Sequence, residues 1–131
     1  MAITKNVSRQ ELLVAYVDIN LADVVSAADG AAIDLPPNAV IVSGNIVTTE
    51  AWNSTSTDVF DVGDAVSQNR YLNDGNIRSL AADVPLVPTG YEHPGGALTV
   101  RWTSGGGSPS TGKARLTVMY YIAGRAETTY G

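Results

Sequence analysis

Hydrophobic and polar residues alternate most regularly in two stretches near the carboxyl end of the chain. In residues 98–103 (LTVRWT) and 114–122 (ARLTVMYYI), apolar side chains recur at every second position. This period of two is typical of β-strands with one buried and one wetter face. Residues 104–112 between them are rich in Gly, Ser and Pro, which predicts a loop and favours a hairpin of the two strands.

The central third of the chain predicts a second pair of strands. Residues 39–52 form a long apolar stretch, in which Gly44 indicates a bulge or a close neighbour. A polar loop over 53–56 leads to a return strand over 57–62. Residues 64–76 are expected to form a loop, because Asn-Asp-Gly at its end is a strong turn signal.

The amino-terminal part is less regular. Residues 11–19 (ELLVAYVDI) are apolar on both faces, which predicts a buried strand, with a short helix over 10–16 as the alternative. Residues 1–34 are interpreted as a lead-in or arm that adds one or two strands to the sheet. Residues 35–131 would form the sandwich body of the same single domain. A short edge strand is expected over 84–87, between prolines.

These patterns predict an all-β fold. About seven or eight short strands with turn signals every 8–12 residues indicate an antiparallel β-sandwich, jelly-roll-like, in a single domain. The 13 glycines and six prolines fit many turns, and 131 residues suffice to bury a core without covalent staples. The absence of cysteine excludes disulfides, thiolate catalysis and cysteine-based zinc sites.

Charge and hydropathy disfavour two classes of binding partner, nucleic acid and membranes. The formal net charge is −5, and the eight Lys and Arg residues are scattered, which disfavours nucleic acid. No apolar run approaches the roughly 20 residues needed to cross a bilayer, so no membrane association is expected. The first residues lack the apolar core of a signal peptide, and synthesis in a cytoplasm is expected.

Two motifs suggest a bound group, but their context favours turns. Residues 107–114 (GSPSTGKA) nearly match the phosphate-binding G-x-x-x-x-G-K-[ST] loop, yet Ala114 replaces the hydroxyl residue and a strand pattern follows. Asp58, Asp61 and Asp64 offer oxygen ligands, but their spacing is not that of a calcium-binding loop. We expect these acids to cap turns at the surface. No metal and no cofactor are predicted.

No catalytic residues are predicted either. His93 is the only histidine, and no G-x-S-x-G elbow is present to supply a nucleophile. A lone histidine in a loop is expected to be solvated.

The residues chosen as candidates for contact with a partner or another subunit are aromatic or charged. Trp102 and Tyr120 lie on apolar strand faces and are expected in the core, whereas other rings border loops or wetter faces. An alternative function uses Trp52, Tyr91 and Tyr121 as a carbohydrate-binding platform. The predicted contact residues are Trp52, Asp61, Asp64, Arg70, Tyr71 and Tyr121.

Several short stretches resemble small structural proteins of tailed bacteriophages, and most closely the head decoration, or cement, proteins. The resemblance begins at residue 35 and rests on LPPNAVI at 35–41, TT at 48–49, DVFDVGD at 58–64, RYL at 70–72, PTGY at 88–91 and GKARLTVMY at 112–120. It implies a non-enzymatic β-sandwich that oligomerises, often as a homotrimer. Such a protein sits on the outer surface of the head and binds across subunits of the major capsid protein.

Two alternatives to this function stay open, namely a tail or head-fibre component of the virion and a carbohydrate-binding module. Residues before 35 match no pattern of the resemblance. Their apolar segment suggests an arm that pairs with a sheet edge on a neighbour or on the capsid.

Overall fold

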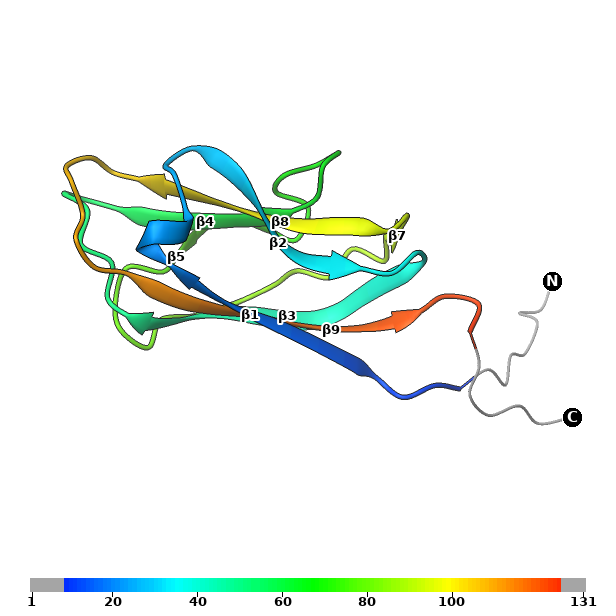
Figure 1. Ribbon diagram of the computed structural model, residues 1–131. Coiled ribbons are helices and arrows are strands. Elements are labelled where there is room, and N and C mark those ends of the chain that lie inside the picture. Colours follow the sequence, from blue (N-terminus) through cyan, green and yellow to red (C-terminus); the bar gives the residue numbers. More distant parts are fainter. Residues whose placement is uncertain (1–8, 126–131) are drawn as a thin grey trace, which may run out of the picture.

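The computed structural model describes residues 9–125 as two β-sheets packed face to face (Figure 1). The first sheet has the order β1 (Leu13–Asn20), β9 (Lys113–Ile122), β3 (Ala39–Glu50) and β6 (Asp83–Pro85), and β7 (Glu92–His93) also pairs with β3. The second has the order β2 (Ala28–Leu35), β8 (Gly96–Ser104), β4 (Asp58–Gly63) and β5 (Leu72–Asn76). A 3₁₀ turn, η1 (Leu21–Asp23), follows β1. The predicted antiparallel β-sandwich is confirmed.

The core lies between the two sheets and is built from the alternating residues of their inner faces. In β8, Leu98, Val100 and Trp102 are buried, and in β9 the inward residues start with Ala114 and Leu116. Successive side chains of a strand point to opposite faces of its sheet. The apolar residues at every second position of a strand therefore all face the core. The prediction of these two strands and of their inner faces is confirmed.

The predicted hairpins are wrong, because the strands that follow each other belong to different sheets. β8 pairs with β2 and β4, whereas β9 pairs with β1 and β3. In the same way β3 and β4 lie in opposite sheets, so that the loop over residues 51–57 crosses the sandwich. Loops of this length span the roughly 10 Å between packed sheets as readily as they close a hairpin. Alternation therefore fixes the faces of a strand without fixing its partner.

Residues 13–20 form the predicted amino-terminal strand, but only one of its faces is buried. Ile19 is in the core, and Ala15 and Val17 pack against it. Val14 and Tyr16 point the other way and are 60% and 65% exposed. β1 is the last strand of its sheet, and no second layer covers its outer face within the described residues.

The turn signal before residue 76 belongs to a bulged strand and not to a loop. Two residues of β5, Asn73 and Asp74, oppose the single β4 residue Asp61. Asp74 has a positive φ of 53°, a backbone conformation that Asp tolerates better than most residues. Asp is common in turns because it tolerates a positive φ, and the same tolerance allows Asp74 to occupy the bulge.

Candidate interaction surfaces

Asp58 is fully buried and belongs to the frame of the sandwich. Its carboxylate accepts hydrogen bonds from the backbone N–H and hydroxyl of Ser54 and from Trp102 Nε1 at 3.1 Å. Arg78 Nη1 lies 3.1 Å from Asp58 Oδ2 and neutralises the charge. These partners satisfy a carboxylate whose burial would otherwise be costly, so its role is structural.

The other two of these three acids bind separate backbone groups, Asp61 in the bulge of β5 and Asp64 in the loop after β4. Asp61 accepts the backbone N–H of Asp74 at 2.6 Å. Asp64 accepts the N–H groups of Val66 at 3.0 Å and Ser67 at 2.9 Å. Asp64 caps a turn as expected, whereas Asp61 bonds across to the neighbouring strand. The expected exposure is wrong, since all three acids are buried. Within residues 9–125, no group of three or more acidic or His side chains is placed to hold a metal ion.

Asp64 and Arg70, both predicted contact residues, form an ion pair. Arg70 Nε lies 2.6 Å from Asp64 Oδ2, and the Arg70 guanidinium lies 3.6 Å from the centre of the Tyr91 ring. Burial by itself disfavours the charge of Asp64. The hydrogen bonds from Arg70, Ser67 and Val66 outweigh it and hold the pKa of Asp64 below its usual value.

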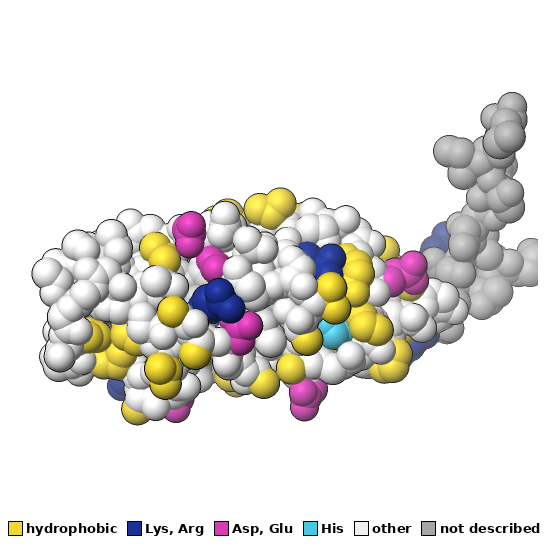
Figure 2. Space-filling view, turned by 90° about the horizontal axis from the view of Figure 1, so that it is seen from above, with side chains coloured by type: hydrophobic (Ala, Val, Ile, Leu, Met, Phe, Trp, Pro, Cys, Tyr) yellow, Lys and Arg dark blue, Asp and Glu magenta, His cyan; other side chains and the backbone are white. Residues whose placement is uncertain are grey.

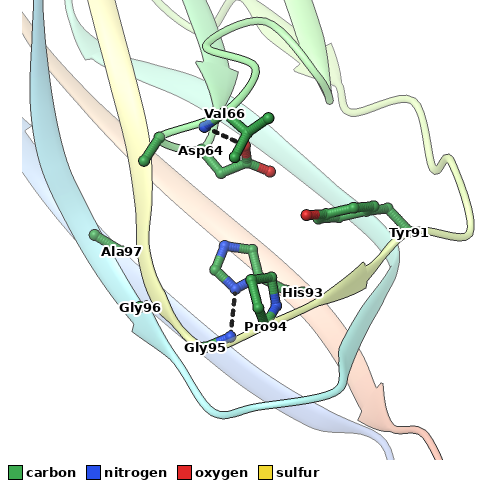
Figure 3. A pocket seen from close by; sticks show the side chains of 9 residues that line it. Asp64, Val66, Tyr91, His93, Pro94, Gly95, Gly96 and Ala97 are labelled. Carbon is green, nitrogen blue, oxygen red and sulfur yellow. Dashed lines mark hydrogen bonds between the residues drawn. The ribbon is translucent and has the colours of Figure 1, made fainter.

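A small hollow of about 140 Å³ lies beside this pair (Figure 3). It is lined by residues 64–66 of the loop after β4 and by residues 91 and 93–97, which run through β7 into the start of β8. His93 is buried there, in contrast to its expected solvation. Its Nδ1 accepts the Gly95 N–H at 3.0 Å, so a neutral ring carries its proton on Nε2. The hollow is smaller than the roughly 300–1,000 Å³ of most ligand pockets, and no Ser, Thr or Cys lines it.

Two of the predicted contact residues have their side chains in the core. Trp52 is 2% exposed, and its ring centroid lies 5.4 Å from those of Phe60 and Trp102. Tyr71 is 1% exposed. Neither side chain is available to a partner in this structure, and the proposed sugar platform loses its tryptophan. The polar loop after Trp52 suggested a surface position, but the ring folds back between the sheets.

Tyr121, in contrast, is 37% exposed and lies on a larger apolar surface that the sequence did not reveal as such. The outer sides of β1, β9 and the middle of β3, with the residue before β1, present a set of hydrophobic side chains. The pair of Val14 with Met119 sets these two side chains on the outer side of the sheet, and Leu12, Tyr16 and Tyr121 share that side by alternation along β1 and β9. Val42 lies at the register shift of β3 and is 37% exposed. We call this the outer apolar face: Leu12, Val14, Tyr16, Val42, Met119 and Tyr121.

The signal for this face was present in the sequence. Residues 12, 14 and 16 are apolar at alternate positions, but so are residues 13, 15 and 17. A strand apolar on both sides is normally buried on both, and here the outer side remains open, with Leu12, Val14 and Tyr16 each at least half exposed. Contiguous exposed apolar surface of this kind marks an interaction site.

The outer face of the other sheet differs in character. Seen from above, it carries Lys or Arg and Asp or Glu side chains near its middle (Figure 2). One ion pair there joins Arg101 Nε of β8 to Asp29 Oδ1 of β2 at 2.7 Å. The hydrophobic side chains of this view are scattered, except around the single histidine at one end of the face. The two faces of the sandwich are therefore unequal, and the apolar one is the better candidate for a protein contact.

Chains in solved bacteriophage capsids share this fold. A chain in the capsid asymmetric unit of cyanophage Pam1 is 19% identical with a TM-score of 0.70, covering 93% of this chain and 91% of that one. A chain in the acid-stable capsid of Helicobacter pylori bacteriophage KHP30 is 17% identical with a TM-score of 0.66, covering 92% and 95%. A chain in the capsid of Ralstonia phage GP4 is 16% identical with a TM-score of 0.62, covering 94% and 91%.

At these identities the likeness establishes a common fold over nearly the whole of each chain. No protein-family model and no curated protein matches the sequence. Within residues 9–125, no helix is long and apolar enough to cross a membrane.

Proposed function

We propose that this protein is a non-enzymatic structural component of a bacteriophage virion, and that it decorates the outer surface of the head. Its partners in this proposal are the major capsid protein and further copies of itself, assembled as a homotrimer. Binding across capsid subunits would stabilise the shell. The proposal requires neither a cofactor nor a metal.

The observation that carries the proposal is an open apolar sheet face on a fold shared with chains of phage capsids. The fold match spans more than nine-tenths of both chains in each comparison. The outer apolar face supplies contact surface that a protein acting alone would not need to expose. The small hollow beside His93 offers no nucleophile–base pair, which favours binding over catalysis.

Weak single contacts are sufficient for this function. A trimer that touches the shell at several points converts modest affinities into strong attachment, because each later contact is made within the same complex. The ion pair of Arg101 with Asp29 lies on the opposite face of the sandwich. It can remain solvated there without weakening a contact made by the outer apolar face.

The proposal is tested by adding purified protein to phage heads that lack it and measuring occupancy by quantitative mass spectrometry. The test variant carries Val42→Asp and Tyr121→Asp, which place charge on the outer apolar face. The matched control carries Ala31→Asp and Thr103→Asp on the exposed outer face of the other sheet. Occupancy of the test variant should fall about tenfold or more, since about 1.4 kcal/mol corresponds to tenfold.

Equal occupancy of both variants would refute the proposed contact face. Copy number separates head decoration from the tail or head-fibre alternative, because a decoration protein covers the whole shell. Native particles that contain only a few copies of the chain would favour the tail or fibre component.

A further inference from the structure

Among the described residues, four of the five strands at the edges of the two sheets are protected against pairing with another chain, one of them β7 with only two residues. β6 is three residues long and ends at Pro85, and β5 is interrupted by the bulge at Asp74. β2 is interrupted by a register shift between Ala31 and Ile33. Short strands, prolines and bulges are the usual means by which sheet edges avoid unwanted pairing.

The remaining edge strand, β1, has none of these features. All eight of its residues are in unbroken antiparallel register with β9, from Leu13 opposite Tyr120 to Asn20 opposite Lys113. It contains neither Pro nor Lys, and its one charged residue, Asp18, is already bonded to Arg115 at 2.8 Å. Its second edge has no partner strand among the described residues. Such an edge is a template for one further strand.

The chain enters β1 from the end of the molecule at which β9 finishes. Gln10 is bonded there by its side chain, which donates to the carbonyl of Ile122 at 2.6 Å and of Arg125 at 3.0 Å and accepts the Ile122 N–H at 2.8 Å. These bonds fix the chain beside β9. A tight reversal of residues 1–8 onto the chain's own β1 is not favoured, because the connecting residues 9–12 (RQEL) lack the Gly, Asn or Asp of two-residue hairpin turns.

Residues 1–8 (MAITKNVS) have the length and the pattern of a strand that fits this edge. Eight extended residues span about 26 Å, the length of β1 itself. Residues 1, 3 and 7 are apolar and alternate with small or polar residues, and position 5 is Lys. We propose that residues 1–8 of one copy add to the free edge of β1 in a second copy.

Charge and side-chain chemistry select a register for this pairing. In an antiparallel arrangement with Val7 opposite Tyr16, Lys5 falls opposite Asp18 and Ile3 opposite Asn20. Val7 then extends the outer apolar face beside a ring that is 65% exposed. Lys5 lies opposite the Asp18 carboxylate, and pairs of opposite charge across strands are favourable. The pair of Val7 with Tyr16 is favourable as well, because β-branched and aromatic side chains pack well across strands.

Arm donation of this kind is heterologous, because the donating segment differs from the accepting edge. A heterologous contact closes into a ring when the rotation allows it, and a ring of three copies matches the proposed homotrimer. The inference deepens the self-association part of the proposed function and does not depend on capsid binding. It is therefore tested on purified full-length protein without phage particles.

The natural absence of cysteine makes disulfide trapping a clean test. Three single variants of the full chain, Val7→Cys, Tyr16→Cys and Asn20→Cys, are prepared with distinguishable masses and mixed in pairs under mild oxidation. Opposed strand residues lie about 4.5–5.5 Å apart at Cα, which suits a disulfide. Asn20 lies four residues further along β1, roughly 13 Å away, and serves as the register control.

The Val7→Cys and Tyr16→Cys mixture should form a mixed disulfide about 100-fold faster than the mixture containing Asn20→Cys. At about 10 µM protein, a docked arm meets its opposite thiol at a near-millimolar effective concentration. Light scattering of the unmodified protein should show a trimer.

Equal trapping rates in the two mixtures, or a monomeric protein, would overturn the inference. So would a double variant, Val7→Cys with Tyr16→Cys, that forms only an intramolecular disulfide, since the arm would then lie on its own strand. Failure of capsid binding, by contrast, would leave the trapping result unchanged.

Discussion

At the scale of single residues, buried polar groups define much of this molecule. Asp58 of β4 gathers three partners around one carboxylate: Ser54 of the crossing loop, Trp102 of the neighbouring strand β8, and Arg78 after β5. Tyr71 places its hydroxyl in the interior without a hydrogen-bond partner among the described residues. Asp64 accepts two backbone N–H groups of the loop that follows it and forms an ion pair with Arg70. Each of these groups predicts a measurable response to substitution or pH.

Asp58→Ala should lower the free energy of unfolding by about 2–3 kcal/mol. The change leaves Trp102 Nε1 without its partner in the interior, while the Ser54 hydroxyl keeps only Ser104 Oγ at 2.8 Å. Removal of one partner of a buried pair typically costs about 3–5 kcal/mol. We reduce that figure because Arg78 is one-third exposed and can turn to water. Urea unfolding monitored by tryptophan fluorescence measures the change. The control is Asp18→Ala in the solvent-exposed pair with Arg115, whose midpoint should hardly move.

Asp64→Asn should flatten the loss of stability in acid. The folded-state pKa of Asp64 is lowered by Arg70 and two backbone N–H groups, so its stabilising contribution is complete above the unfolded-state pKa of about 3.9. It is lost as the pH falls through the lower folded-state pKa. Urea midpoints measured from pH 7 down to about pH 2 should fall less steeply for the variant below about pH 4. Parallel curves for the two proteins would contradict this assignment.

Tyr71→Phe should leave stability at pH 7 unchanged or raise it by about 1 kcal/mol, because it removes a buried hydroxyl without a partner. Burial raises the pKa of Tyr71 from 10.0 to about 12. Folding therefore favours the neutral phenol, and stability is lost as the pH rises between these two values. Urea midpoints in alkaline buffers should decline less for the variant. A large loss of stability at pH 7 would show that the hydroxyl has a partner after all.

At the scale of elements, close approach of the strands depends on glycine at one position in β3. The sequence predicted a bulge or a close neighbour at Gly44, and the structure shows the close neighbour at Gly44 itself and an irregular register nearby. The register with β9 shifts just before it, between Ile41 and Ser43. A Cβ at Gly44 would lie 2.5 Å from the Thr117 carbonyl oxygen and 2.8 Å from Leu86 Cδ1.

Gly44→Ala should therefore destabilise the sandwich by about 2 kcal/mol or more, since overpacking against fixed backbone typically costs about 1–3 kcal/mol. Gly30→Ala in β2 is the matched control, because its Cβ would approach nothing closer than the Val100 carbonyl oxygen at 4.0 Å. The control should change stability little in the same thermal unfolding experiment. Similar losses in both variants would mean that strand propensity, and not the contact with β9, sets the cost.

Local sequence pattern predicted the positions and faces of some strands but not the strands with which they pair. The strands over residues 98–103 and 114–122 and their inner faces were predictable, because a period of two is a property of the chain itself. Their partners were not, because pairing with β2 and β4 or with β1 and β3 joins residues far apart in sequence. The structure places the predicted contact residues differently from one another. Tyr121 lies at the surface, but Trp52 and Tyr71 do not, since loop sequences do not show whether a ring turns inward.

At the scale of the whole molecule, the first two strands complete both sheets. β1 covers the side of β9, and β2 covers the side of β8. Their inward residues Ile19, Ile33 and Leu35 belong to the core. Residues 1–34, interpreted from sequence as a lead-in or arm that adds one or two strands, include β1 and nearly all of β2.

Removal of residues 1–34 should prevent folding, because it exposes the edges of β8 and β9 and opens the core on one side. Circular dichroism and analytical size exclusion should show an unfolded or aggregated chain. Removal of residues 1–8 alone is the control and should preserve a cooperative unfolding transition. A folded, soluble 35–131 fragment would contradict this view of the sandwich.

The sequence by itself determined that the chain is all-β, where most strands lie and which side of the late strands faces inward, because these properties follow from local alternation and turn residues. Only the tertiary structure decided that the strands cross between two sheets, that Asp58, Asp61 and Asp64 are buried on separate partners, and that one apolar side of β1 stays open. Pairing and burial depend on contacts between distant residues, and a local pattern contains no record of them.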